Sequence, residues 1–74
     1  MKFKAALFYN GCIAYYNIFL IAENYYKVKL DTYKGEASPP VLIELFKDGY
    51  TWCSNCSDHE LTKELGAAIE QRLN

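Results

Sequence analysis

Residues 12 to 22, with the sequence CIAYYNIFLIA, form the longest apolar run of the chain. Alternate residues of a β-strand point to opposite faces of a sheet, and this run is apolar on both sets of positions. A strand of that kind is typical of a sheet that is covered on both sides. The rest of the sequence predicts only one helix, which covers one side. The sheet must therefore curl over itself or leave an apolar face for a partner.

Turn signals divide the chain into five predicted strands followed by one helix. Asn10-Gly11 and Asp48-Gly49 are typical of tight hairpin turns, because Asn, Asp and Gly accept positive φ. Glu23-Asn24 separates two further apolar stretches, and Pro39-Pro40 delays the next strand because proline donates no ladder hydrogen bond. The predicted strands cover residues 2–9, 12–22, 25–33, 41–47 and 50–54, and the predicted helix covers about 58–73.

The helix is expected to bury one side against the sheet. Ser57 and Glu60 have the spacing of a capping box at its start. Gly66 is unfavourable in a helix interior by about 1 kcal/mol relative to Ala, unless it allows close approach to the sheet. An apolar stripe then follows at helical spacing: Leu61, Leu65, Ala68, Ile69 and Leu73.

The fold class that follows is α+β, in a single small domain of residues 1–74. We predict an antiparallel four- to five-stranded meander sheet with one C-terminal helix packed on one face. The sheet would span residues 2–54. The overall pattern resembles small bacterial single-domain proteins without indicating a particular family.

Side-chain alternation predicts which residues face inwards. Tyr26, Val28, Leu30 and Thr32 form the apolar face of the third strand. A two-residue turn at Glu23-Asn24 then places alternate residues of the second strand on that face: Ile13, Tyr15, Asn17, Phe19 and Ile21.

The first strand depends on the turn at Asn10-Gly11. A two-residue turn there would bring Lys2 and Lys4 into this core, so we predict a three-residue loop with Gly11 as a bulge. That loop turns Phe3, Ala5, Leu7 and Tyr9 inwards. In the last hairpin the expected inner side chains are Val41, Ile43, Leu45, Tyr50 and Trp52.

This register leaves an apolar outer face that needs cover. The residues predicted to form an interaction surface there are Tyr16, Ile18, Leu20 and Tyr25. The expected partner is a second copy of the chain, in a homodimer, or another protein. The other interpretation is a tightly twisted sheet whose lysine stems shield part of the patch.

The segment WCSNC, residues 52 to 56, resembles the WCxxC signature of thioredoxin-like oxidoreductases over five residues. That resemblance implies a reactive thiol at a helix N-terminus, where the helix dipole favours the thiolate. A thioredoxin fold also needs further strands and a proline after the motif, and only one helix follows Cys56. Thiol redox chemistry of Cys53 and Cys56 is thus predicted only on a different fold.

Zinc is the second interpretation of this segment, and no other cofactor is expected. Cys53, Cys56 and His59 would supply three ligands and Cys12 a fourth, if folding brings it near. In the third interpretation Trp52 belongs to the core, and the cysteines have no function. No nucleophile, base and acid can be grouped from the sequence, so a non-catalytic protein is predicted.

Charge and hydropathy restrict the partners further. The net charge is −1, whereas nucleic-acid binders usually carry a basic excess. A mixed surface of lysines and tyrosines has the residue types that stack bases, but net charge places nucleic acid below protein. The apolar run is too short for a membrane helix, so no membrane is expected. An odd number of cysteines favours a reducing compartment, and we expect a cytoplasmic protein.

Overall fold

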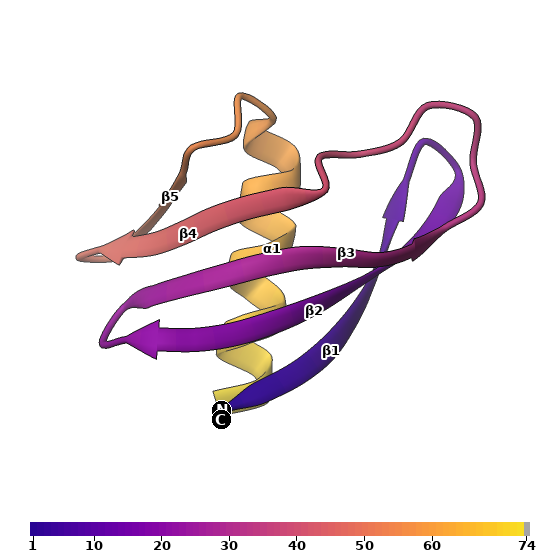
Figure 1. Ribbon diagram of the computed structural model, residues 1–74. Coiled ribbons are helices and arrows are strands. Elements are labelled where there is room, and N and C mark those ends of the chain that lie inside the picture. Colours follow the sequence, from indigo (N-terminus) through magenta and orange to yellow (C-terminus); the bar gives the residue numbers. More distant parts are fainter. Residues whose placement is uncertain (74) are drawn as a thin grey trace.

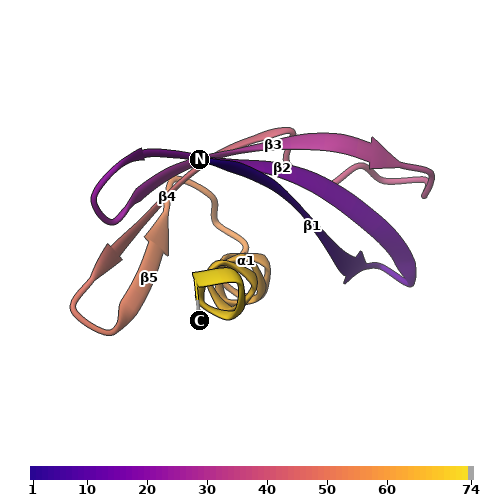
Figure 2. The same ribbon diagram turned by 90° about the horizontal axis from the view of Figure 1, so that it is seen from below.

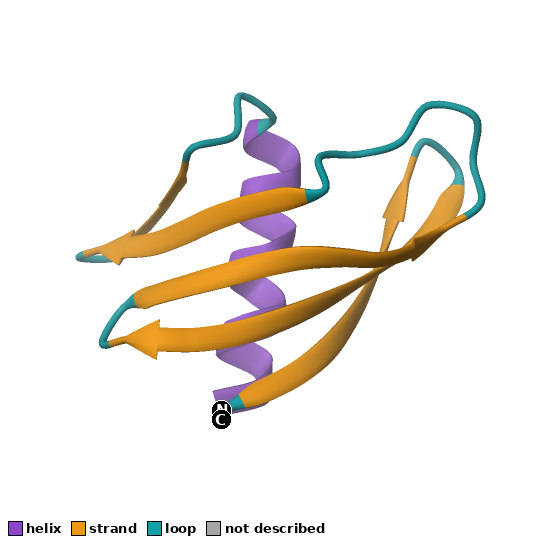
Figure 3. Ribbon diagram, in the orientation of Figure 1, coloured by secondary structure: helices purple, strands orange, loops and turns teal. Residues whose placement is uncertain are grey.

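The computed structural model describes residues 1–73 and has an α+β architecture (Figure 1). Five antiparallel strands lie in the sheet in chain order, and one helix follows them (Figure 3). The fold class predicted from the sequence is confirmed. The strands are β1 (Lys2–Tyr9), β2 (Cys12–Ala22), β3 (Tyr25–Tyr33), β4 (Leu42–Asp48) and β5 (Thr51–Ser54), and the helix is α1 (His59–Leu73).

The sheet is strongly curled, and α1 lies in its concave side (Figure 2). One helix therefore covers the inner face of all five strands. In the part of the chain that the structure describes, no helix is long and apolar enough to cross a membrane. The hydrophobic core lies between the sheet and the helix. The buried apolar core residues are Ala5, Leu7, Ala14, Tyr16, Ile18, Tyr26, Val28, Ile43, Leu45, Leu61, Leu65 and Ile69.

The turn between β1 and β2 is a two-residue turn, so the predicted three-residue bulged loop is wrong. Tyr9 pairs directly with Cys12. Asn10 and Gly11 have φ values of 49° and 81°, as a type I′ turn requires. The inner side chains of β1 are nevertheless the predicted ones, Phe3, Ala5, Leu7 and Tyr9.

The predicted facing of β2 is wrong as well, because of a bulge near its end. Ala22 pairs with Tyr25 across the expected two-residue turn, but a register shift follows and Leu20 pairs with Tyr26. The extra residue reverses the parity, so Ile18 lies opposite Val28. The side chains of Tyr16 and Ile18, predicted on the outer face, are completely buried. Those facing outwards are Ile13, Tyr15, Asn17 and Phe19.

The two errors offset each other in β1. A bulged first turn and an unbulged second strand each change the parity once, so the two changes cancel and the predicted inner side chains of β1 agree with the structure. A second register shift separates the pairs Tyr16–Leu30 and Tyr15–Thr32. Asp31 is the extra residue there, and Thr32, predicted on the inner face, is exposed.

Tyr16 also fixes the long connection between β3 and β4. Its hydroxyl donates a hydrogen bond to the Pro40 carbonyl oxygen, over 2.8 Å. Burial raises the pKa of the Tyr16 phenol well above its usual value. A buried hydroxyl needs a hydrogen-bond partner, and the Pro40 carbonyl oxygen supplies it. The same bond holds the proline segment against the edge of the core.

The β4–β5 hairpin turns one residue later than predicted. Asp48 pairs with Thr51, so Gly49 and Tyr50 form the turn, and Gly49 has a φ of 64°. Tyr50, predicted to face the core, is 99% exposed, and Val41 is exposed too. Ile43, Leu45 and Trp52 do pack on the helix side, as predicted.

The helix begins with Asp58 as its cap, and the predicted Ser57–Glu60 capping box does not form. The Leu61 amide donates to Asp58 Oδ1 over 3.0 Å. The Thr62 amide donates to the Asp58 carbonyl oxygen over 3.1 Å. Asp is as effective as Ser at this position, and its carboxylate also interacts favourably with the helix N-terminus.

Gly66 brings α1 into close contact with β5, as the sequence suggested. The Trp52 ring lies directly over Gly66, and a Cβ atom there would overlap the indole atoms Cγ and Cδ1. The indole Nε1 donates a hydrogen bond to Glu70 one turn further along the helix, and Lys47 lies 5.5 Å from the ring centroid. The glycine is therefore required by packing against β5.

We expect Gly66→Ala to destabilise the protein by about 1–3 kcal/mol through overpacking, although Ala is favoured by about 1 kcal/mol in a helix interior. Urea denaturation measures the change. In a Trp52→Leu background, where the overlap is removed, the same substitution should stabilise the protein. Stabilisation by Gly66→Ala in the wild type would contradict this packing.

Candidate binding surface and the cysteine segment

The outer, convex face of the sheet carries the features that the fold does not use. No element covers it within residues 1–73, because α1 packs on the concave side (Figure 2). The register defines its members. Its apolar side chains are Ala6 and Phe8 on β1, Ile13, Tyr15 and Phe19 on β2, Tyr25 on β3, and Leu42 and Phe46 on β4.

Four lysines cross the middle of this face in two rows, which we call the lysine band: Lys2 and Lys4 on β1 and Lys27 and Lys29 on β3. Phe19 lies between Lys2 and Lys27 in one row, and Asn17 lies between Lys4 and Lys29 in the other. The ammonium group of Lys2 is 5.6 Å from the centroid of the Phe19 ring.

Two carboxylates adjoin the lysine band. Glu44 pairs with Lys27 across the β3–β4 ladder, and Asp31 forms an ion pair with Lys4 over 3.0 Å. The hydrogen bond and charge of Lys4 lower the pKa of Asp31. This pair is exposed to solvent and contributes little to stability. Four lysines adjoin two carboxylates, so the band has an excess of positive charge.

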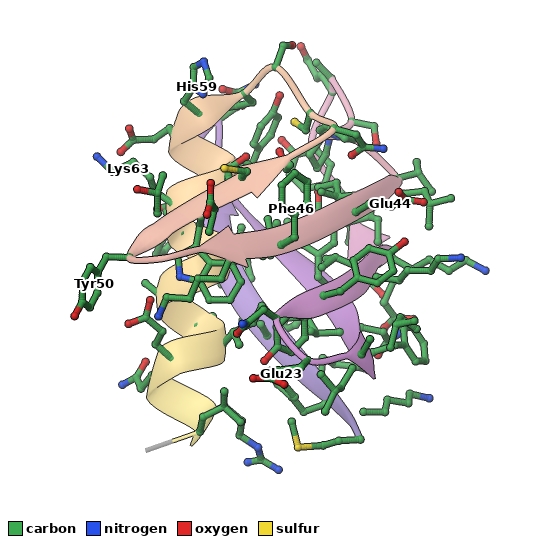
Figure 4. The ribbon with its side chains drawn as sticks, turned by 90° about the vertical axis from the view of Figure 1, so that its left-hand side faces the viewer. Glu23, Glu44, Phe46, Tyr50, His59 and Lys63 are labelled. Atoms are coloured by element: carbon green, nitrogen blue, oxygen red, sulfur yellow. The ribbon has the colours of Figure 1, made fainter. Side chains whose placement is uncertain are left out.

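An apolar corner patch lies beyond the lysine band, at the end of the sheet near the β2–β3 turn. We define it as Ile21, Tyr25 and Phe46. Tyr25 pairs directly with Phe46, and Ile21 lies in the adjacent bulge. Ile21 and Phe46 are about half exposed, and Phe46 projects from β4 on the side away from the helix (Figure 4).

The structure separates the four residues predicted as an interaction surface. Tyr16 and Ile18 are in the core, and Leu20 is partly exposed on the same side of the sheet. Only Tyr25 lies on the outer face, in the corner patch. Because the predicted facing of β2 was reversed, the predicted surface did not include Ile13, Tyr15 and Phe19, which do face outwards. Two signals together would have found them: lysines on alternate β1 positions, and an Asn-Gly pair that forms a strict two-residue turn.

The cysteine segment joins β5 to α1. Cys53 lies within β5 and pairs with Phe46, which places it on the outer face. The Cys56 sulfur accepts a hydrogen bond from the Asp58 amide over 3.3 Å and packs against the core. His59 is the first residue of α1 and points away from the molecule (Figure 4).

The four predicted zinc ligands do not come together. Cys12 lies on the inner side of β2, whereas Cys53 lies on the outer face, because the β2 parity is opposite to the predicted one. Among the described residues, no three His, Cys, Asp or Glu side chains are grouped as metal ligands. All three cysteines are unpaired thiols.

Comparison with known proteins identifies no relative of this chain. No family model matches it, and no curated protein or solved structure is similar to it at a significant level. The function must therefore be inferred from the surface itself.

Paired isoleucine substitutions test which side of β2 is outward. Ile18→Val removes a methyl group from the core and should destabilise the protein by about 0.5–1.5 kcal/mol. Ile13→Val changes the outer face and should alter stability by less than about 0.5 kcal/mol. Chemical denaturation of both variants measures this, and a larger loss at Ile13 than at Ile18 would refute the register.

Proposed function

We propose that this chain is a small non-catalytic interaction domain that pairs with a second copy of itself through the corner patch. The observation that supports this is the exposure of Phe46, beside Tyr25 on the uncovered outer face, and of Ile21 in the adjacent bulge. Apolar side chains gathered on an uncovered surface commonly mark a protein contact. Another protein with an apolar surface is the alternative occupant of the same patch.

The position of the patch suits a two-fold arrangement. In such a dimer the same patch on each copy faces the other, and aromatic side chains such as Tyr25 and Phe46 contribute large contact area. The corner patch lies at the end of the sheet, beyond the two rows of the lysine band. Docking there keeps the lysines of the two copies apart, whereas stacking the whole outer faces would oppose them.

A thiol function for Cys53 and Cys56 is the second candidate. Both residues line a cleft of about 250 Å³ between β5 and α1, together with His59 and Thr62. Through this cleft, small thiol reagents can reach Cys53 and Cys56. Unpaired thiols persist in a reducing compartment, which supports our proposal of a cytoplasmic location.

Sedimentation velocity across the micromolar range tests the pairing. We expect the weight-average mass of the wild type to rise with concentration towards that of a dimer. The double variant Ile21→Ser/Phe46→Ser should remain monomeric and folded, because both side chains are about half exposed. Phe8→Ser, at the other end of the same face, is the matched control and should dimerise like the wild type.

A wild type that stays monomeric throughout this range would contradict self-association. Equal dimerisation of the wild type and the double variant would show that a different surface forms the dimer.

A further inference from the structure

We propose that the lysine band and the aromatic rings beside it bind single-stranded nucleic acid. This inference concerns a part of the outer face separate from the corner patch, so it does not depend on self-association. It goes beyond an interaction with protein because it assigns a ligand class to four lysines that the fold does not need.

The fold separates charges that cancel along the sequence. The whole chain has a net charge of −1, which argues against a polyanionic ligand when all residues are counted together. In the structure, however, Glu60, Glu64 and Glu70 lie on α1, where they outnumber Lys63 and Arg72, on the opposite side of the sheet from the lysine band. Among residues 1–73, the outer face thus presents four lysines with only the carboxylates of Glu44 and Asp31 adjoining them.

The spacing of the lysines forms a compact basic surface. Lys2 and Lys4 are two residues apart on one strand, a separation of about 6.8 Å along the strand axis. Lys27 and Lys29 repeat that spacing on β3, two strands away across β2, about 10 Å in the plane of the sheet. A flexible phosphate backbone that crosses the face can contact several of these ammonium groups.

Aromatic rings lie where bases would stack. Phe19 lies in the first row of the lysine band. Tyr15 lies on the same strand and face, one row beyond the second row of the band. Phe8 lies at the next row, next to Ile13, and is 68% exposed. Aromatic side chains on an open sheet, combined with basic residues that follow the backbone, are the two requirements for binding single strands.

Other ligands use only part of this surface. A second copy of the face would oppose lysine to lysine, and an acidic peptide would use the charges without needing the rings. A nucleic-acid duplex hides its bases within the stack, so rings on the sheet cannot stack on them. Unpaired bases on a phosphate backbone complement both features.

Fluorescence anisotropy with a labelled oligothymidylate tests the inference. A duplex of equal length and a polyglutamate peptide are the comparison ligands. We expect the wild type to bind the single strand more tightly than either, with an affinity that falls as salt rises. Lys27→Gln/Lys29→Gln should weaken binding and make the salt dependence shallower by about 1–2 in slope.

Tyr15→Ser should reduce affinity for the single strand by roughly five-fold or more, since each stacked base contributes substantially to binding. Tyr50→Ser is the matched control, because that tyrosine is in the β4–β5 turn and fully exposed. Lys63→Gln on α1 is the control for charge. Circular dichroism verifies that each variant is folded, and neither control should change the affinity.

Three results would overturn the inference. They are absence of binding to the single strand, equal binding to the duplex, and single-strand binding that Tyr15→Ser leaves unchanged. Polyglutamate binding that depends on Lys27 and Lys29 but exceeds binding of the single strand would assign the band to an acidic protein instead. The sedimentation result for the corner patch is independent of all of these outcomes.

Discussion

One helix has to cover the inner face of five strands, and this constraint shapes the rest of the structure. The sheet meets it by curling until both edge strands approach α1 (Figure 2). Bulges increase the local twist and bend a strand, and the two register shifts of the β2–β3 ladder lie in the longest strands. Gly66 completes the closure because it lets the Trp52 ring lie directly on the helix.

The arrangement of elements could be predicted because each boundary has a local chemical cause. Asn10-Gly11, Asp48-Gly49 and Pro39-Pro40 restrict the backbone directly, and the predicted bounds agree with the structure within one or two residues. The direction of the β2 side chains could not be predicted in this way. The bulge at Ile21 follows from the packing of Tyr16 and Ile18 into the core, and no glycine or other local signal marks it.

The candidate surface was mispredicted for the same reason. A strand that is apolar on both faces gives no indication of which face is inward, so one bulge exchanges a buried set for an exposed set. The lysines of β1 carried the missing information, because Lys2 and Lys4 cannot enter the core and β1 pairs with β2 through a strict turn. Net charge was equally uninformative, since the fold gathers four of the lysines on the outer face and three of the glutamates on α1.

The central claim is the register of β2 on β3, and a nuclear Overhauser spectrum tests it most directly. The Leu20 amide donates a hydrogen bond to the Met1 carbonyl oxygen, next to β1, and the Leu30 amide donates one to the Val41 carbonyl oxygen, beside β4. The backbone groups of Ile18 and Val28, two residues away on each strand, point the same ways, so these residues face each other as a pair without mutual hydrogen bonds. The Cα atoms of such a pair are about 4.5 Å apart, which brings their Hα atoms into close contact. We predict a strong Hα–Hα cross-peak between Ile18 and Val28. A cross-peak from Phe19 to Val28 in its place would show that the bulge is absent and would contradict both the core and the outer face described above.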